Sequence, residues 1–212
     1  MTQDFRGGGV SLKVEHDFDS FLLRSITSWR SFDSRNQRDM DGSPANFGWA
    51  DYRDEQSQLS QEFNLIGTAA DGRLDWTVGA HYFTEDSDSR WRSGLADGLY
   101  PALEAMPPGS FPFPVGVDPQ GNPIYIFLGG AGNPFNTALE LVKLYAPELE
   151  TDSYAAFGEF EWHFTDALSG IVGARYTHDS KDYRFSNSGI VSGLLDPGYP
   201  IQASDSWGDV SP

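Results

Sequence analysis

The feature that most constrains this chain is an alternation of apolar and polar side chains with a period of two residues. Residues 74–82 alternate Leu, Trp, Val, Ala and Tyr with Asp, Thr, Gly and His. Residues 154–164 repeat the pattern, with aromatic and small side chains alternating with Glu and His. This period belongs to β-strands whose two faces meet different surroundings, so the chain is predicted to be all-β and antiparallel.

Six such segments pair into three hairpins with short turns, at about residues 8–33, 55–87 and 151–183, and a seventh strand is expected to begin near Asp205. The connections between hairpins are long, at roughly 34–54, 88–150 and 184–204. Structureless loops beyond about 12–15 residues are uncommon in compact soluble domains. A transmembrane barrel instead has short periplasmic turns and long extracellular loops. We therefore expect an up-and-down segment of such a barrel, with a short helix at about 137–145 that Pro147 ends.

Aromatic side chains recur at the spacing that a membrane barrel requires. An apolar band about 25 Å tall, crossed by tilted strands, separates two aromatic girdles by roughly eight to ten residues. Four strands place Trp, Tyr or Phe near such depths, with small and aliphatic residues between them. The expected membrane-interface aromatics are Phe21, Trp29, Trp76, Tyr82, Tyr154, Trp162, Phe164 and Tyr176.

The opposite face carries charged residues, which cannot line a dry core but fit the wet interior of a wide barrel. The expected lumen-facing residues are Glu62, Asp75, Glu159, Glu161 and Arg175. Six or seven strands cannot close around such a lumen and would leave bare edges. We therefore expect an open piece of a larger barrel. A soluble sandwich or lipocalin-like barrel is the alternative that the alternation alone leaves open.

Composition excludes several other classes. The formal net charge of −17 disfavours a nucleic-acid partner, because a phosphate backbone would be repelled. The 14% of aromatic residues argues against disorder, and no apolar run approaches the roughly 18 residues of a membrane helix. The first residues do not resemble a signal peptide. The absence of Cys removes disulfides and thiol catalysis.

Several of these segments resemble strands of the TonB-dependent receptors, at residues 23–33, 59–65, 73–79, 82–83, 152–158, 163–166 and 173–177. The resemblance covers most of residues 8–183 and is specific in combination. It implies a barrel of roughly 22 strands, plugged by an N-terminal globular domain, in the outer membrane of a Gram-negative cell. It also implies active import of a scarce nutrient, such as an iron–siderophore complex, with energy relayed by the TonB complex.

The chain departs from the pattern of that family, since we find no plug, no TonB-contacting segment and no final strand ending in an aromatic residue. We therefore expect a fragment that lacks the plug and terminal strands. The partners that the resemblance implies are outer-membrane lipid and lipopolysaccharide, the TonB complex through the missing plug, and a small nutrient complex. A passive porin and a soluble β-domain that binds carbohydrate or protein are the alternative functions.

Loop 88–150 is the best candidate for ligand contact, because binding residues favour loops on a rigid scaffold. The candidate residues are Trp91, Arg92, Phe111, Phe113, Tyr125, Phe127 and Phe135. The competing interpretation is that these aromatics pack into a self-contained cap on the barrel mouth. A charged cluster of Asp86, Asp88, Arg90 and Arg92 is interpreted as a solvated rim.

No enzyme, cofactor or metal site is predicted. Glu159, Glu161 and His163 share a strand face but are interpreted as residues that line the lumen. Asp39-x-Asp41-Gly42 resembles the start of a calcium loop, yet the next ligand positions are occupied by Pro44 and Phe47, which offer no side-chain oxygens. An outer-membrane hydrolase would need a convincing Ser or Asp/His set at the rim, which we do not find.

Overall fold

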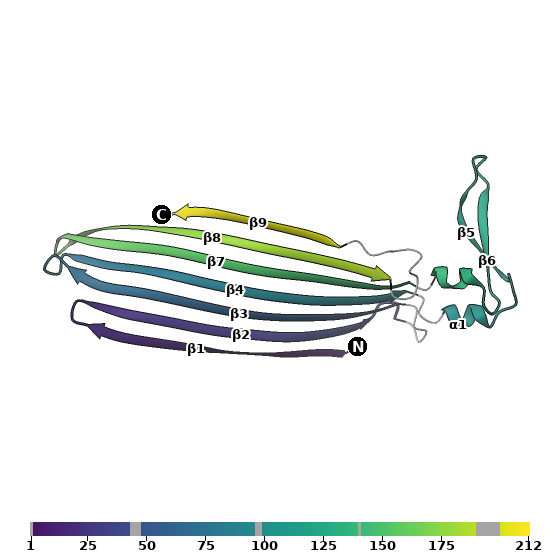
Figure 1. The fold of residues 1–212 in the computed structure, drawn as a ribbon, viewed down its shortest axis with the longest axis horizontal. Coiled ribbons are helices and arrows are strands. Elements are labelled where there is room, and N and C mark those ends of the chain that lie inside the picture. The colour runs from purple at the N-terminus through teal and green to yellow at the C-terminus, as the bar shows by residue number, and fades with distance from the viewer. Residues whose placement is uncertain (1, 43–47, 96–98, 140, 190–199) are drawn as a thin grey trace.

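Seven long strands form one antiparallel sheet in which almost every strand lies beside its predecessor in sequence (Figure 1). The computed structural model describes residues 2–42, 48–95, 99–139, 141–189 and 200–212. Their spatial order is β1-β2-β3-β4-β7-β8-β9. The strands are β1 (Thr2–Phe18), β2 (Phe21–Asp39), β3 (Gly48–Ala69), β4 (Leu74–Leu95), β7 (Leu141–Thr165), β8 (Leu168–Gly189) and β9 (Ile201–Ser211). The predicted all-β, up-and-down antiparallel architecture is confirmed.

Three short turns lie together at one end of the sheet, and the long connections leave from the other end (Figure 1). Asp19 and Ser20 join β1 to β2, and Asp166 and Ala167 join β7 to β8. The turn between β3 and β4 spans residues 70–73, two more than the Asp71-Gly72 hairpin signal predicts. Gly72 has a φ of 83°, in the left-handed region that only glycine adopts at little cost.

The strands extend well beyond the apolar segments from which they were predicted. Strand β2 continues to Asp39 and β4 to Leu95, while β3 already begins at Gly48 and β7 at Leu141. Strand β9 begins at Ile201 rather than near Asp205. The ladder of backbone hydrogen bonds continues where the alternation of apolar residues stops, because both faces are polar there. Part of each predicted long loop is therefore strand.

The predicted helix at 137–145 is wrong. Residues Pro134–Leu139 form a 3-10 helix, η1, and Leu141 already belongs to β7. Pro147 lies inside β7, where it pairs with Phe185 of β8. Pairing with β4 is interrupted there, between the Asp88–Glu148 and Trp91–Tyr145 pairs. A proline lacks the N–H that a central strand needs, so the ladder opens at this point instead of the chain turning helical.

The sheet is open among the residues that the structure describes. Strand β1 pairs with β2 alone and β9 with β8 alone, so the two edge strands lie at opposite sides of the sheet. An edge strand presents unpaired N–H and C=O groups that favour pairing with further strands. The openness agrees with the expectation that this sheet is one sector of a larger barrel.

Residues 99–139 form a separate small unit beyond the ends of the strands (Figure 1). This insertion contains α1 (Leu99–Glu104), the hairpin β5 (Phe111–Val117) and β6 (Pro123–Leu128), and η1. Its elements pack mainly on one another. Neither described helix combines the length and the apolar character needed to cross a membrane.

Candidate functional site

The strand register gives the sheet two chemically different faces, because directly paired residues of antiparallel strands share a face. Phe21, Gly67 and Trp76 are paired in one row, and Tyr82 and Tyr154 in another. Seven of the eight predicted interface aromatics thus share what we call the band face: Phe21, Trp29, Trp76, Tyr82, Tyr154, Trp162 and Tyr176. Phe164 lies at the irregularity between His163 and Thr165.

Many apolar side chains of the band face are exposed. Val172 is 68% exposed and Val14 is 52% exposed, although neither lies at a strand end. Neighbouring rings contact across strands, with centroids 4.9 Å apart for Phe18 and Phe21 and 4.8 Å for Tyr82 and Tyr154. Water-soluble monomers rarely expose apolar patches of this extent. The face is therefore built to meet an apolar partner.

Farther from the short turns, the band face becomes charged. A hollow there is lined by carboxylates from four strands, with Arg6 as its only basic lining residue. We call these residues the acidic belt: Asp33, Glu55, Asp86, Asp88, Glu148 and Glu150. Arg184 of β8 lies 3.3 Å from Glu150 and 3.8 Å from Glu148. The solvated rim predicted at Asp86 and Asp88 is thus part of a wider acidic surface.

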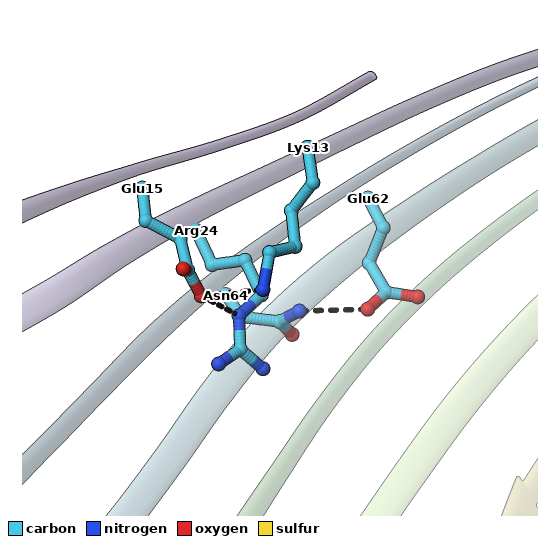
Figure 2. A network of polar contacts seen from close by, with 5 residues as sticks. All are labelled: Lys13, Glu15, Arg24, Glu62 and Asn64. Carbon is cyan, nitrogen blue, oxygen red and sulfur yellow. Dashed lines mark hydrogen bonds and ion pairs between the residues drawn. The ribbon is translucent and has the colours of Figure 1, made fainter. Parts of the chain in front are cut away.

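The opposite face, which we call the polar face, holds all five residues predicted to line a lumen. Figure 2 shows a polar network on this side of the first three strands. Glu15 accepts a hydrogen bond from Arg24 Nε at 2.7 Å and lies 3.2 Å from Lys13 Nζ. The amide of Asn64 donates to Glu62 at 2.7 Å. Paired charges and hydrogen bonds of this kind are suited to a hydrated surface.

A close packing contact interrupts the polar face in its centre. The ring of Phe157 in β7 lies over Gly79 of β4, so a Cβ at Gly79 would overlap it. The guanidinium of Arg175 lies 5.6 Å from the centroid of the same ring. Gly79 is therefore needed here because it lets an aromatic ring cross the neighbouring strand.

Near the short turns, the polar face gathers a His and two carboxylates. Asp75 and Glu161 are direct cross-strand partners in β4 and β7. His163 Nε2 lies 2.8 Å from Asp75 Oδ2, and its Nδ1 lies 4.0 Å from Glu161 Oε1. The sequence grouped Glu161 and His163 by their spacing on one strand. It predicted Asp75 as lumen-facing but not its contact with His163, because that contact depends on the register between strands.

The far end of the sheet is held by charged pairs. Arg35 of β2 donates from Nε and Nη2 to the two carboxylate oxygens of Asp51 in β3, at 3.0 and 2.7 Å. This hydrogen bonding lowers the pKa of Asp51 below its usual range and raises that of Arg35. The Asp51 side chain is 8% exposed, so Arg35 pairs with a carboxylate that is almost completely buried.

Two of the seven candidate ligand residues belong to the sheet. Trp91 and Arg92 are consecutive residues of β4 and therefore lie on opposite faces. Trp91 donates from Nε1 to Asp54 at 3.3 Å, and the Arg92 guanidinium lies 5.7 Å from the Trp49 ring centroid. The other five residues lie in the insertion: Phe111, Phe113, Tyr125, Phe127 and Phe135. The structure thus divides the predicted group into two places.

The insertion has a core of its own, centred on the fully buried side chains of Leu103, Leu128 and Asn136. Asn136 accepts a hydrogen bond from the backbone N–H of Gly129 at 2.8 Å. Its amide donates to Glu104 at 2.6 Å and to the carbonyl of Gly130 at 3.0 Å. The N–H of Gly132 and the Asn136 amide hold the pKa of Glu104 below its usual value. This network fixes the fold of the insertion, and sequence reasoning missed it.

Most of the candidate aromatics are outside that core. Phe111, Tyr125, Phe127 and Phe135 are 42–56% exposed. They lie on or beside the β5–β6 hairpin, which projects away from the direction of the sheet strands (Figure 1). The sequence has no Lys or Arg between Arg92 and Lys143. The insertion therefore presents an ordered surface that is aromatic and without positive charge.

The possible calcium site at Asp39 and Asp41 extends to Pro44 and Phe47, which lie outside the described residues. Within the described part, Asp39 accepts hydrogen bonds from the backbone N–H groups of Asp41 and Gly42, at 3.0 and 3.2 Å. Asp41 accepts one from Gly48 at 2.6 Å. Both carboxylates therefore accept hydrogen bonds from backbone N–H groups at the end of β2 and the start of β3.

Comparison with known proteins identifies the relatives of this sheet. No curated protein matches the chain in sequence. Among solved structures, the ferric yersiniabactin uptake receptor FyuA from Yersinia pestis superposes with a TM-score of 0.60 and 12% identity. The match covers 98% of this chain and 25% of FyuA, so the chain spans about a quarter of that receptor's length.

A family model matches almost the whole chain, over residues 2–212. Its description is TonB-dependent receptor-like, β-barrel. The match includes the strands that carry the band face, the polar face and the insertion between β4 and β7. The long antiparallel strands and the open sheet agree with a sector of such a barrel. The chain belongs to the family of TonB-dependent receptor β-barrels.

Proposed function

We propose that this chain is part of the barrel wall of an outer-membrane transporter that imports a small nutrient complex with energy from the TonB complex. The observation that carries the proposal is the band face, on which exposed apolar side chains and aromatic rings stand together across the strands. Such a face suits lipid, and the charged polar face suits a hydrated lumen. The short turns then lie on the periplasmic side and the insertion on the extracellular side.

The transport itself is tested in the full-length protein. Cells that carry it, with or without a functional TonB complex, are given labelled candidate nutrients, including iron–siderophore complexes. Uptake that needs both the protein and TonB supports the proposal. Uptake that continues unchanged without TonB would instead identify a passive pore.

The geometry favours active transport over the passive porin. A porin's long loop usually folds inward to narrow the channel, whereas residues 99–139 extend beyond the ends of the strands (Figure 1). The exposed band face also disfavours a soluble domain that binds carbohydrate or protein, because lipid would cover this surface and water would not.

The exposed aromatics of the insertion support a role in contacting the nutrient complex. Aromatic side chains offer a large contact area at a low cost in conformational entropy. Replacing Phe127 and Tyr125 by Ser should weaken binding of the transported compound while the barrel still assembles. Replacing Val117, which is 67% exposed farther along the same hairpin, provides the control.

The acidic belt supports a contact with lipopolysaccharide. It adjoins the band face on the side away from the short turns, which is the level of the outer-leaflet headgroups in this orientation. Carboxylates do not attract the phosphates of lipopolysaccharide directly, but divalent cations bind both groups. Chelation of divalent cations should therefore release bound lipopolysaccharide from the purified protein.

A further inference from the structure

The polar face has a side-chain cluster near the short turns, away from the insertion and the acidic belt. It lies where β4 begins and β7 ends. A backbone hydrogen bond joins the two segments there. The N–H of His163 donates to the carbonyl of Arg73 at 2.8 Å. Asp75 and Glu161 then pair directly across the strands, and His163 follows two residues after Glu161 on the same face.

The three side chains converge on one point. One ligand atom from each of Asp75, Glu161 and His163 lies within 4.8 Å of the others. Two ligands at about 2.1 Å from a tetrahedral ion are roughly 3.4 Å apart, so only small side-chain rotations would close the set. The side chains are 48%, 33% and 36% exposed, which leaves the cluster open to ions from solution.

The surroundings attract cations. The hollow beside the cluster is lined by Asp17, Asp19 and Glu159 in addition to Asp75 and Glu161, and no Lys or Arg lines it. Carboxylates alone would favour hard ions such as Ca²⁺ and Mg²⁺. An imidazole nitrogen changes this preference, because it suits borderline transition metals. His163 is therefore the residue that makes the cluster selective.

We propose that Asp75, Glu161 and His163 form a three-ligand site for a divalent ion of the Zn²⁺ class. The two carboxylates and the imidazole would supply two oxygens and one nitrogen, and water would complete the coordination. The bound ion would join β4 to β7 next to the turns, on the face that we assign to the lumen. The proposal does not rest on the identity of the transported compound or on coupling to TonB.

Zn²⁺ titration calorimetry on the detergent-solubilised full-length protein tests the site, in excess Mg²⁺ to occupy non-specific carboxylates. We expect one saturable Zn²⁺ site that responds to changes in this chain. Loss of an outer-shell partner commonly costs a metal site 10–100-fold in affinity. His163 is proposed as a direct ligand, so His163→Ala should weaken Zn²⁺ binding at least about tenfold. Glu161→Gln should do the same while leaving the His163–Asp75 hydrogen bond intact.

Two control variants separate the site from diffuse attraction. His81→Ala removes an imidazole from the polar face away from the cluster, and Glu159→Gln removes a carboxylate from the same hollow. Both should bind Zn²⁺ within about twofold of the wild type, since neither loses a ligand. Absence of saturable binding, unchanged binding in His163→Ala, or an equal loss in Glu159→Gln would overturn the proposal. None of these results would alter TonB-dependent uptake, which is measured separately.

Discussion

The sheet and the insertion differ in where their stability comes from. The insertion buries Leu103, Leu128 and Asn136 completely and satisfies Asn136 with three internal hydrogen bonds. The sheet leaves many of its largest apolar side chains exposed on the band face, including Val172 at 68%. One region therefore carries its own core, whereas the other exposes its apolar side chains and has two open edges.

Exposure of an apolar side chain has a different meaning in the two regions. In the insertion, water is the solvent, so exposed Phe127 and Phe135 indicate a surface that can bind a ligand. On the band face, lipid is the proposed solvent, so an exposed apolar side chain is one that would contact lipid. With lipid as the proposed solvent, the exposed apolar surface of the band face is a solvation feature and not a specific binding site.

The largest effect on stability is expected when a charge is placed in the proposed lipid contact. Ala174 is exposed on the band face between Val172 and Tyr176. An Arg near the bilayer midplane costs a barrel about 2–4 kcal/mol, so Ala174→Arg should lower the free energy of unfolding in lipid by that amount. Thr177→Arg on the polar face should change it by less than about 1 kcal/mol. Equal effects in denaturant titrations would contradict the assignment of the faces.

Close packing within the sheet is tested at Gly79 of β4, beneath the Phe157 ring of β7. A Cβ at Gly79 would lie 2.6 Å from Asn64 Oδ1 and overlap the Phe157 ring. Gly79→Val should therefore destabilise the sheet by about 1–3 kcal/mol, the usual cost of overpacking. Gly8→Ala, where nothing lies within 4 Å, should be close to neutral. Recovery of stability in Gly79→Val combined with Phe157→Ala would locate the clash.

The independence of the insertion is tested at Asn136. Asn136→Ala leaves the buried N–H of Gly129 without its partner, at a cost of about 1–3 kcal/mol, and removes one of the two hydrogen bonds to Glu104. We expect faster proteolysis within 99–139, with unchanged heat stability of the barrel. Gln120→Ala, in the exposed turn of the β5–β6 hairpin, should not alter cleavage. Loss of barrel stability in Asn136→Ala would show that the two regions are not separate.

The smallest expected effect is a dependence on pH at the far end of the sheet. Arg35 lowers the pKa of Asp51 in the folded state, so the pair contributes stability above the unfolded pKa of about 3.9. That contribution is lost as the pH falls through the lower, folded pKa. Protection of the backbone amides near the Arg35–Asp51 pair against exchange, relative to the intrinsic exchange rate at each pH, should therefore fall in acid, below about pH 4. Asp51→Asn should exchange faster already at neutral pH and lose this acid dependence.

Much of the sheet was predictable from the sequence because two-residue periodicity is a local property. The positions of the interface aromatics and of the five polar-face residues follow from that alternation alone. The ends of the strands did not follow, because the alternation stops where both faces are wet, as from Asp33 to Asp39. The ladder there depends on neighbouring strands, which no local pattern encodes.

The candidate sites were predictable only in part, for the same reason. The aromatics of the insertion were visible in the sequence, but their separation from Trp91 and Arg92 depends on how far β4 continues. The core around Asn136 had no signal, since Asn residues near a glycine-rich run are typical of many loops. Asp75 joins His163 only through the register between β4 and β7.

The assignment of the band face to lipid and of the polar face to water is tested position by position along one strand. The chain contributes no Cys of its own, so single Cys replacements along β8 from residue 170 to 186 can carry a spin label in the full-length protein once any Cys outside this chain has been replaced. In outer membranes, accessibility to oxygen should exceed that to a water-soluble nickel complex at 172, 174 and 176, and the order should reverse at 175 and 177. From residue 180 onward both faces should be accessible to the nickel complex. Uniform accessibility along the strand, or the opposite phase, would contradict the account.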